Sequence, residues 1–367
     1  MRVISILTFY LLVCNLCFSQ QRHLWVPGIL DGTVGTFVYG GEYADPMNGL
    51  LVNAFYIYRT TDGGLNWERR FQNNGLDCFV SEVSYPKKNY AFVAIKEGIA
   101  LSTDDGETWK KKKIFKDSIN DSRLSMFDEN NGGLVIVTFA KTPTTHLLIT
   151  EDGWLTSREL HVPKPKNWGD SDNISFHRVV CIAPKVYLVG IYSYKYKNMF
   201  YRTTDAGETW ELIPDPTKPN RGTSVQVFRY SFINEKEGVM VGPDQDSITK
   251  NKSLDFQLTK DGGLTWQPFA IFNIDKNQLP LNDFVYMGNG KLTFITNFIY
   301  RTEDGGKTFV RDSILNMPEI IFNLIHNKKG GRSSIFFNGV WHDSGPIPIK
   351  SVIDDINLTV KRKMKFW

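Results

Sequence analysis

Cysteine is scarce in this sequence. Four cysteines are present, and two of them, Cys14 and Cys17, lie in an apolar segment at the N-terminus. A scaffold held together by disulfides needs a denser framework than the remaining pair supplies. Because Cys78 and Cys181 fall in different units of the repeat described below, we expect two buried free thiols.

A strong charge of either sign is also lacking. The 43 lysines and arginines oppose 39 aspartates and glutamates, which gives a net charge of +4. Without Arg2 the balance is 42 against 39, or +3. Nucleic-acid-binding domains concentrate much more positive charge, so we expect no nucleic-acid partner.

Long apolar runs are confined to residues 1–19, where Arg2 precedes an uninterrupted apolar stretch and Ser19 stands before Gln20. This pattern is typical of a secretory signal peptide that is cleaved after Ser19. A membrane anchor is the alternative, but the run is short for crossing a bilayer. We therefore expect a secreted, periplasmic or extracellular protein without stable membrane insertion, in which residues 20–367 form one domain.

Motifs for metal-dependent and nucleophilic catalysis are missing. There is no G-x-S-x-G nucleophile motif and no glycine-rich phosphate loop. The histidines are scattered and form no ligand pairs, so no metal and no cofactor are expected. They are His23, His146, His161, His177, His326 and His342.

What the sequence does contain is a repeat of eight residues. Its copies are TTDGGLNW (60–67), STDDGETW (102–109), TEDGWLTS (150–157), TTDAGETW (203–210), TKDGGLTW (259–266) and TEDGGKTF (302–309). The third copy is degenerate, with Trp154 at the glycine position and Ser157 at the aromatic position. Successive copies lie 42 to 56 residues apart, about the length of one four-stranded propeller blade.

Each residue type in the motif suits a tight turn between two antiparallel strands. The aspartate can accept backbone N–H bonds, the glycine can adopt positive φ, and the aromatic ring can pack between sheets. The aspartates are Asp62, Asp104, Asp152, Asp205, Asp261 and Asp304. We therefore interpret them as structural and not catalytic.

The motif resembles the Asp-box, S/T-x-D-x-G-x-T-W/F, of sialidases, sortilin-type receptors, xyloglucan-active glycoside hydrolases and photosystem II assembly factors. The resemblance implies an all-β propeller of four-stranded blades, with the boxes at the blade periphery and away from the ligand face. The order of strand, polar turn, V-x-V-G and box, as in residues 228–242, is most similar to the assembly factors. We favour seven blades, the last without a box in residues 319–367, and six blades with a C-terminal extension is the alternative.

Three arginines occupy matching places in successive repeats. Arg123 begins RLSMFDENNG and Arg229 begins RYSFINEKEG, while Arg178 lies at the corresponding place between them. Arginine suits the capture of carboxylate or phosphate groups, so the three could form an anion site on the innermost strands. The assembly-factor resemblance implies an arginine-rich face that grips a partner. The alternative is that each arginine pairs with an acid of another blade, such as Glu82 or Asp283.

A second candidate site is aromatic. Trp168, in a loop at 161–173, and Tyr192, Tyr194 and Tyr196 could stack on sugars. The tyrosines alternate with period two, which also describes one face of a strand. Packing is the interpretation that this spacing favours.

The sequence thus favours a secreted, non-catalytic propeller that binds a protein or glycan at its channel face, and the arginines favour an anionic ligand. A glycoside hydrolase of the sialidase type is the alternative, although the R-I-P motif of sialidases is absent. A hydrolase would require the arginines to converge with a tyrosine and two carboxylates at one mouth of the channel.

The signal-peptide interpretation makes a direct prediction. Protein recovered outside the cytoplasm should begin at or near Gln20, because cleavage after Ser19 removes the apolar segment. N-terminal sequencing checks this. An intact Met1 on a membrane-embedded chain would contradict it.

Overall fold

The computed structural model describes the chain over most of the repeat region and in short segments beyond it. The described residues are 25–27, 38–53, 56–64, 66–72, 82–96, 98–116, 119–138, 144–164, 174–193, 197–213, 229–245, 252–274, 281, 283–296, 298–311, 321–325, 333–338, 341–342 and 345–346. Within them the regular structure consists of β-strands, and no helix of the described part is long and apolar enough to cross a membrane.

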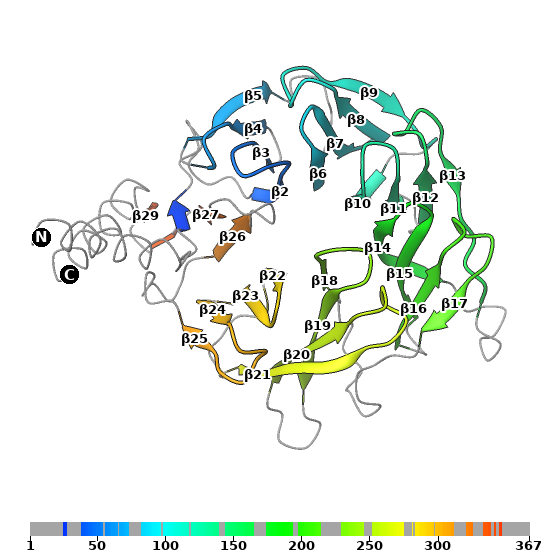
Figure 1. Cartoon of the computed structure of the whole chain (residues 1–367). Coiled ribbons are helices and arrows are strands. Elements are labelled where there is room, and N and C mark those ends of the chain that lie inside the picture. The colour runs from blue at the N-terminus through cyan, green and yellow to red at the C-terminus, as the bar shows by residue number, and fades with distance from the viewer. Residues whose placement is uncertain are drawn as a thin grey trace, which may run out of the picture.

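Six four-stranded antiparallel sheets, the blades, form a ring (Figure 1). Blade 1 contains β2 (Val38–Tyr43), β3 (Gly49–Asn53), β4 (Tyr56–Thr60) and β5 (Glu68–Gln72). Blade 2 contains β6 (Glu82–Lys87), β7 (Tyr90–Ile95), β8 (Gly98–Ser102) and β9 (Lys110–Lys113). Blade 3 contains β10 (Ile119–Met126), β11 (Gly132–Thr138), β12 (Thr145–Thr150) and β13 (Arg158–Glu159).

The other three blades follow the same order. Blade 4 contains β14 (Ser175–Ala183), β15 (Val186–Ser193), β16 (Lys197–Thr203) and β17 (Glu211–Ile213). Blade 5 contains β18 (Arg229–Phe232), β19 (Gly238–Gln245), β20 (Lys252–Thr259) and β21 (Gln267–Ile274). Blade 6 contains β22 (Asp283–Gly288), β23 (Lys291–Ile295), β24 (Ile299–Thr302) and β25 (Val310–Arg311).

Between blade 6 and blade 1 lies a smaller sheet. β26 (Ile321–Ile325) pairs antiparallel with β27 (Ser333–Asn338), and β1 (Trp25–Pro27) joins β27 in parallel. The four-stranded blades therefore number six, and this three-stranded sheet stands where we favoured a seventh. A separate hairpin pairs β28 (Trp341–His342) with β29 (Gly345–Pro346). The strand expected at 358–363 lies outside the described residues.

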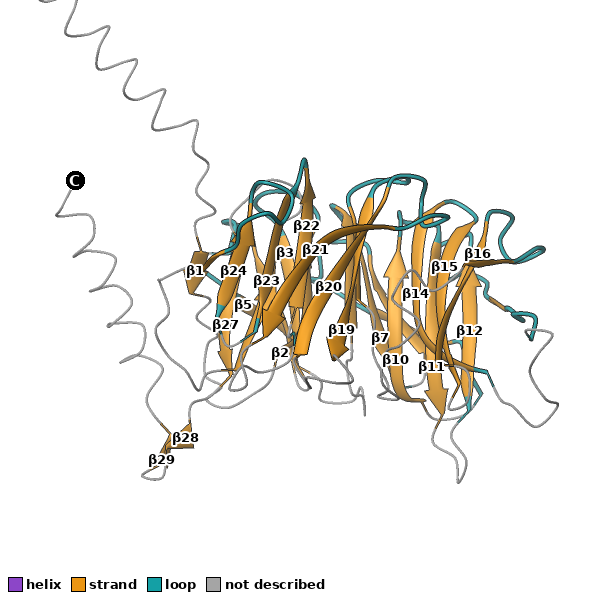
Figure 2. Ribbon diagram, turned by 90° about the horizontal axis from the view of Figure 1, so that it is seen from below, coloured by secondary structure: helices purple, strands orange, loops and turns teal. Residues whose placement is uncertain are grey.

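In every blade the first strand lies nearest the ring centre and the fourth lies outermost (Figure 1). Seen from the side, the strands run across the thickness of the ring, and most of the described turns gather at one rim (Figure 2). At that rim the motif turn and the first hairpin of the same blade bond to each other, for example through Gly262 N–H to the Lys236 carbonyl at 2.8 Å.

Every motif copy forms the same hydrogen-bonded turn between the third and fourth strands. In blade 4 the Thr203 hydroxyl donates to Asp205 Oδ1 at 2.7 Å and accepts the Gly207 N–H at 2.8 Å. Asp205 also accepts the N–H of Thr209 at 2.9 Å and its hydroxyl at 2.5 Å. The Thr209 bonds lower the pKa of Asp205 to about 2. The aspartates therefore serve the turn, as their sequence pattern predicts.

The turn contains two consecutive residues with positive φ, whereas the sequence pattern indicated only one. The motif glycine is the second, as in Gly207 at 90°. The residue before it is also left-handed, including Ala206 at 58° and Asp105 at 59°. Side chains with a Cβ are therefore accepted at the first position, although the left-handed region is costly for them.

The degenerate third copy of the motif keeps the left-handed turn, but its aromatic side chain stands at the glycine position. Trp154 occupies the glycine position at a φ of 66° and is 2% exposed. Its indole packs among residues of blades 2 and 3, including Phe92 and Leu134, and donates to Met126 Sδ at 3.1 Å. In blade 2, by comparison, Trp109 of the regular motif packs between blades 1 and 2. Trp154 thus supplies the interblade ring that Ser157 cannot.

Replacing Gly207 by Ala should lower the free energy of unfolding by about 1–3 kcal/mol, because a Cβ there is left-handed and would lie 2.8 Å from Leu160. Gly305→Ala is the control. No neighbouring atom lies within 4 Å of a Cβ at that site, so only the φ strain of about 1 kcal/mol applies. Urea unfolding measures both, and equal losses would show that the Leu160 contact is unimportant.

Trp154→Gly should destabilise the protein. Loss of a buried indole costs about 3–5 kcal/mol, which exceeds the roughly 1–2 kcal/mol gained by relieving left-handed strain. Adding Ser157→Trp should restore much of the loss, since the ring then returns to the usual motif position. Thermal unfolding of the single and double variants checks this. An unchanged melting temperature in Trp154→Gly would contradict the idea that the Trp154 indole replaces the aromatic side chain missing at Ser157.

Candidate functional site

Strand register identifies one equivalent position on the innermost strand of every blade. In blade 3, Leu147 lies on the third strand, three residues before the motif threonine. Leu147 pairs with Val135 of the second strand, and Val135 pairs with Arg123 of the first strand. The same two steps in each blade define what we call the channel ring. It consists of Gly40, Glu82, Arg123, Arg178, Arg229 and Asp283.

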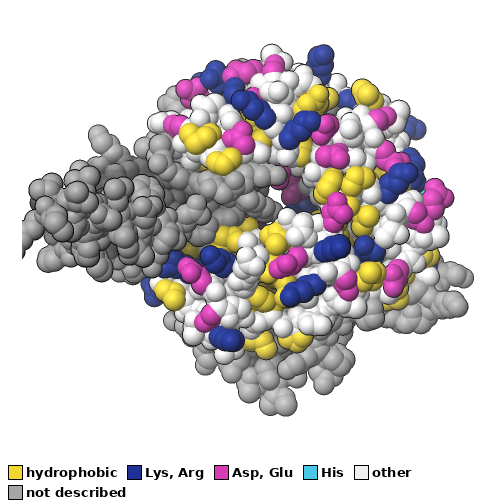
Figure 3. All heavy atoms as spheres, viewed as in Figure 1, with side chains coloured by type: hydrophobic (Ala, Val, Ile, Leu, Met, Phe, Trp, Pro, Cys, Tyr) yellow, Lys and Arg dark blue, Asp and Glu magenta, His cyan; other side chains and the backbone are white. Residues whose placement is uncertain are grey.

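The channel ring lies toward the face opposite the motif turns. Glu82, Arg229 and Asp283 are the first residues of β6, β18 and β22, whose other ends lead into the turn rim. In β14 a register irregularity immediately precedes Arg178, and in β10 one lies between Ile119 and Asp121, two residues before Arg123. Such bulges redirect side chains and occur often beside functional sites. Viewed along the ring axis, the molecule is hollowed at its centre, where acidic and basic side chains are visible (Figure 3).

The ring arginines form ion pairs, two of them with the acids that the sequence suggested as partners. Arg178 Nη2 lies 3.2 Å from Glu82 Oε1, which links blade 4 to blade 2 past blade 3. Arg229 Nη1 lies 3.7 Å from Asp283 Oδ1, within ion-pair range but beyond a normal hydrogen bond. Arg123 pairs with Asp121 of its own strand and donates to the Ser122 carbonyl at 2.8 Å.

Electrostatic coupling indicates that these charges lie near one another. Burial lowers the pKa of Arg229, with Asp283 opposing this effect and the like charges of Arg178 and Arg123 adding to it. Burial, followed by repulsion from Arg123, also lowers the pKa of His177. The three arginines on first strands of consecutive blades are thus close enough to repel one another.

Hydrogen bonds between neighbouring first strands hold the ring in register. In four blades a polar side chain on the first strand of the preceding blade accepts a backbone N–H from the next first strand. The pairs are Tyr85 to Glu42 at 2.8 Å, Leu124 to Glu82 at 2.6 Å, Cys181 to Ser125 at 3.1 Å and Tyr286 to Ser231 at 3.0 Å. Glu82 therefore both orients Arg178 and ties blade 2 to blade 3.

Other predicted site residues are not brought to this ring. The motif aspartates lie in the turns between third and fourth strands. Tyr192 lies on β15, paired with Ser175 and Asn198, and its side chain is not described. Trp168, Tyr194, Tyr196 and Cys78 lie outside the described residues. Cys181 is a buried free thiol whose pKa burial raises to about 12.

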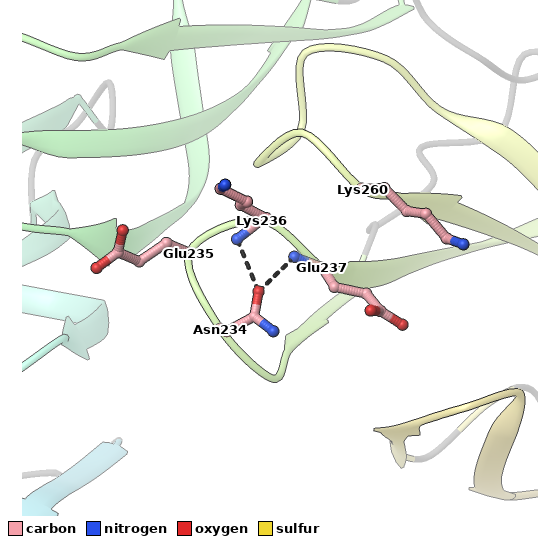
Figure 4. Close-up of a pocket in the computed structure, with 5 residues that line it drawn as sticks. All are labelled: Asn234, Glu235, Lys236, Glu237 and Lys260. Carbon is pink, nitrogen blue, oxygen red and sulfur yellow. Dashed lines mark hydrogen bonds between the residues drawn. The ribbon is translucent and has the colours of Figure 1, made fainter.

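A surface hollow of about 500 Å³ lies beside the β18–β19 hairpin and is lined by Asn234, Glu235, Lys236, Glu237 and Lys260. Asn234 Oδ1 accepts the N–H groups of Lys236 and Glu237 at 2.8 and 2.7 Å, which caps the turn. Glu235 and Lys236 point to one side and Glu237 and Lys260 to the other (Figure 4). Glu237 also accepts a hydrogen bond from the Tyr286 hydroxyl. We therefore assign the hollow to turn structure.

Several residues in or beside the ring were missed in the sequence. Asp121, His177 and Gly40 carried no motif, and only strand register places them beside the arginines. Gly40 leaves open space, since a Cβ there would meet no atom within 4 Å. Among the residues that the structure describes, no cluster of three or more His, Cys, Asp or Glu side chains could hold a metal ion.

Neither a protein-family model nor a curated protein matches the sequence. Among solved structures, YCF48 from Cyanidioschyzon merolae has a TM-score of 0.56 at 16% identity, over 83% of this chain and 93% of that one. Streptogramin B lyase has a TM-score of 0.53 at 13% identity, over 84% and 92%. An ancestral GH74 enzyme has a TM-score of 0.50 at 14% identity, over 87% and 49%.

The fold is a β-propeller. At these identities the likenesses establish the fold alone, because one fold hosts many unrelated activities. Function must be argued from the ring itself.

Proposed function

We propose that this protein is a secreted, non-catalytic propeller that binds an anionic group of a protein or glycan at its channel ring. The observation that carries the proposal is the gathering of Arg123, Arg178 and Arg229, each half-buried, at one equivalent position of three consecutive blades. The resemblance of the sequence motif to photosystem II assembly factors supports a binding role.

The ion pairs of the ring leave hydrogen-bonding capacity unused. A guanidinium carries five N–H donors, and the acids that face Arg178 and Arg229 each approach through a single oxygen. At 3.7 Å, Asp283 makes no normal hydrogen bond to Arg229. A ligand carboxylate can therefore accept bonds from Arg229 without first breaking a bidentate pair.

A sialidase-like hydrolase is the competing function. It requires a carboxylic acid that stays protonated until it donates to the leaving group. Glu82, Asp121 and Asp283 instead each lie beside an arginine. Nor does a described tyrosine pair with these acids at the ring, so the geometry favours binding over hydrolysis.

The test uses Arg229→Ala, with Arg301→Ala as the control. Arg301 is a half-buried arginine on β24 that pairs with Glu303 and lies outside the ring. Acidic peptides and uronic-acid or sialic-acid oligosaccharides serve as probes. Arg229→Ala should weaken binding by about 1.5–3 kcal/mol, roughly 10- to 150-fold, with little change in melting temperature, whereas Arg301→Ala should bind as wild type.

Two results would contradict the proposal. If Arg229→Ala unfolds the protein while the folded fraction still binds, the arginine is a structural ion-pair member. If the unmodified protein instead hydrolyses glycosides in a substrate screen, the hydrolase is the correct function.

A further inference from the structure

The outer wall of the ring carries its charge unevenly. β9 consists of four lysines, Lys110–Lys113, and β5 of the adjacent blade contains Arg69 and Arg70 with one acid, Glu68. The outer strands of the other blades are balanced or nearly uncharged: β13 is RE, β17 is ELI, β21 is QPFAIFNI and β25 is VR. We call β5 and β9 together the basic arc.

The two strands of the arc are neighbours. They follow one another around the outer wall in Figure 1, and Arg70 of β5 lies 3.5 Å from Glu107 in the turn that leads into β9. The arc is therefore one continuous surface across blades 1 and 2.

The acids near the arc are already engaged. Asp104 holds the motif turn through Ser102 and Thr108, and Asp105 accepts bonds from Tyr85 and Asn89. Glu107 pairs with Arg59 and with Arg70. Glu68 also pairs with Arg70, so part of the charge of β5 is neutralised within the arc. Among the described residues no carboxylate forms an ion pair with Lys110 or Lys113, both of which are exposed. Lys110 and Lys113 are thus not neutralised by the described acids around them.

Protection of a free strand edge does not explain the four consecutive lysines of β9. Edge strands often use a lysine to prevent pairing with another chain. β21 is an outer strand of eight residues without one charged side chain, and it is twice as long as β9. The ring therefore does not need lysines at its outer edges, and four in succession exceed what edge protection requires.

The chemistry of the arc fits a linear anionic polymer. Alternate residues on a strand are about 6.6–6.8 Å apart, and β9 presents lysines on both sides. Lys112 donates to the Leu155 carbonyl, whereas Lys110 and Lys113 are exposed point charges. Lysine attracts carboxylate or sulfate without demanding a fixed geometry. Nucleic-acid strands also call for exposed aromatic platforms, but Tyr56, beside the arc, is covered by the Arg69 guanidinium at 4.8 Å.

We infer that the basic arc is a second binding surface, separate from the channel, that takes an extended acidic polysaccharide along β9. Binding there is electrostatic and sensitive to salt, because the lysine ammonium groups are exposed and neutralise repeated anionic groups. The ligand contacts the wall of the ring, so it leaves the channel ring accessible.

The experiment measures the affinity of the full chain for polygalacturonate and heparin at about 50 and 200 mM salt. Lys110→Gln/Lys113→Gln should weaken binding about tenfold at low salt and reduce its salt dependence. The matched control is Lys236→Gln/Lys260→Gln, which removes the same charge from exposed lysines of blade 5 and should bind as wild type. Adding Lys110→Gln/Lys113→Gln to an Arg229→Ala background should cause the same tenfold loss as in the wild type, which separates this surface from the channel.

Three outcomes overturn the inference. Equal losses in the two lysine pairs would mean that binding follows net charge alone. The absence of binding to both polysaccharides at low salt would mean that the arc has no such ligand. Tighter binding to single-stranded oligothymidylate or to phosphatidylserine vesicles would assign the arc to a different class of partner.

Discussion

The hydroxyl of the motif Ser or Thr holds each blade together at its outer hairpin. It accepts the N–H of the residue four positions on and donates to the aspartate, which in turn holds the threonine that follows. In blade 4 these bonds join Thr203, Asp205 and Thr209. With the turn fixed in this way, the third and fourth strands pair in one register, and the aromatic side chain enters the seam between blades. Register in turn decides which first-strand residue reaches the channel.

The sequence motif predicted the turns, their spacing and the role of the aspartates, because those bonds are local. It did not predict the second left-handed position, since glycine is not required there and Ala206 and Asp105 carry no signal. It also left open whether Trp154 at the glycine position abolishes the turn or replaces the aromatic side chain that the third copy lacks. Only the packing across blades 2 and 3 shows that the Trp154 indole fills the seam between these blades, although it comes from a different position in the motif.

The arginines were predictable for the same reason as the turns: two of them align in repeats that share a register. Their partners were harder to find. Arg178 reaches Glu82 two blades away, a pairing that depends on ring curvature and has no local signature in the chain. Asp121 precedes Arg123 by two residues and could have been noticed as an ion-pair candidate on one strand face. The basic arc was visible as KKKK, but its significance depends on β9 being an outermost strand.

The parallel strand β1 has a consequence for how the protein is made. Pairing of Trp25 with Ser333 joins segments from nearly opposite ends of the sequence. During synthesis the blades can form in succession, since their contacts are local, but the circle remains open until β27 has left the ribosome. The last step is a loop closure of very high contact order, which makes it the slow event of folding. Until then the exposed flanks of blades 1 and 6 are the surfaces that a chaperone would have to cover.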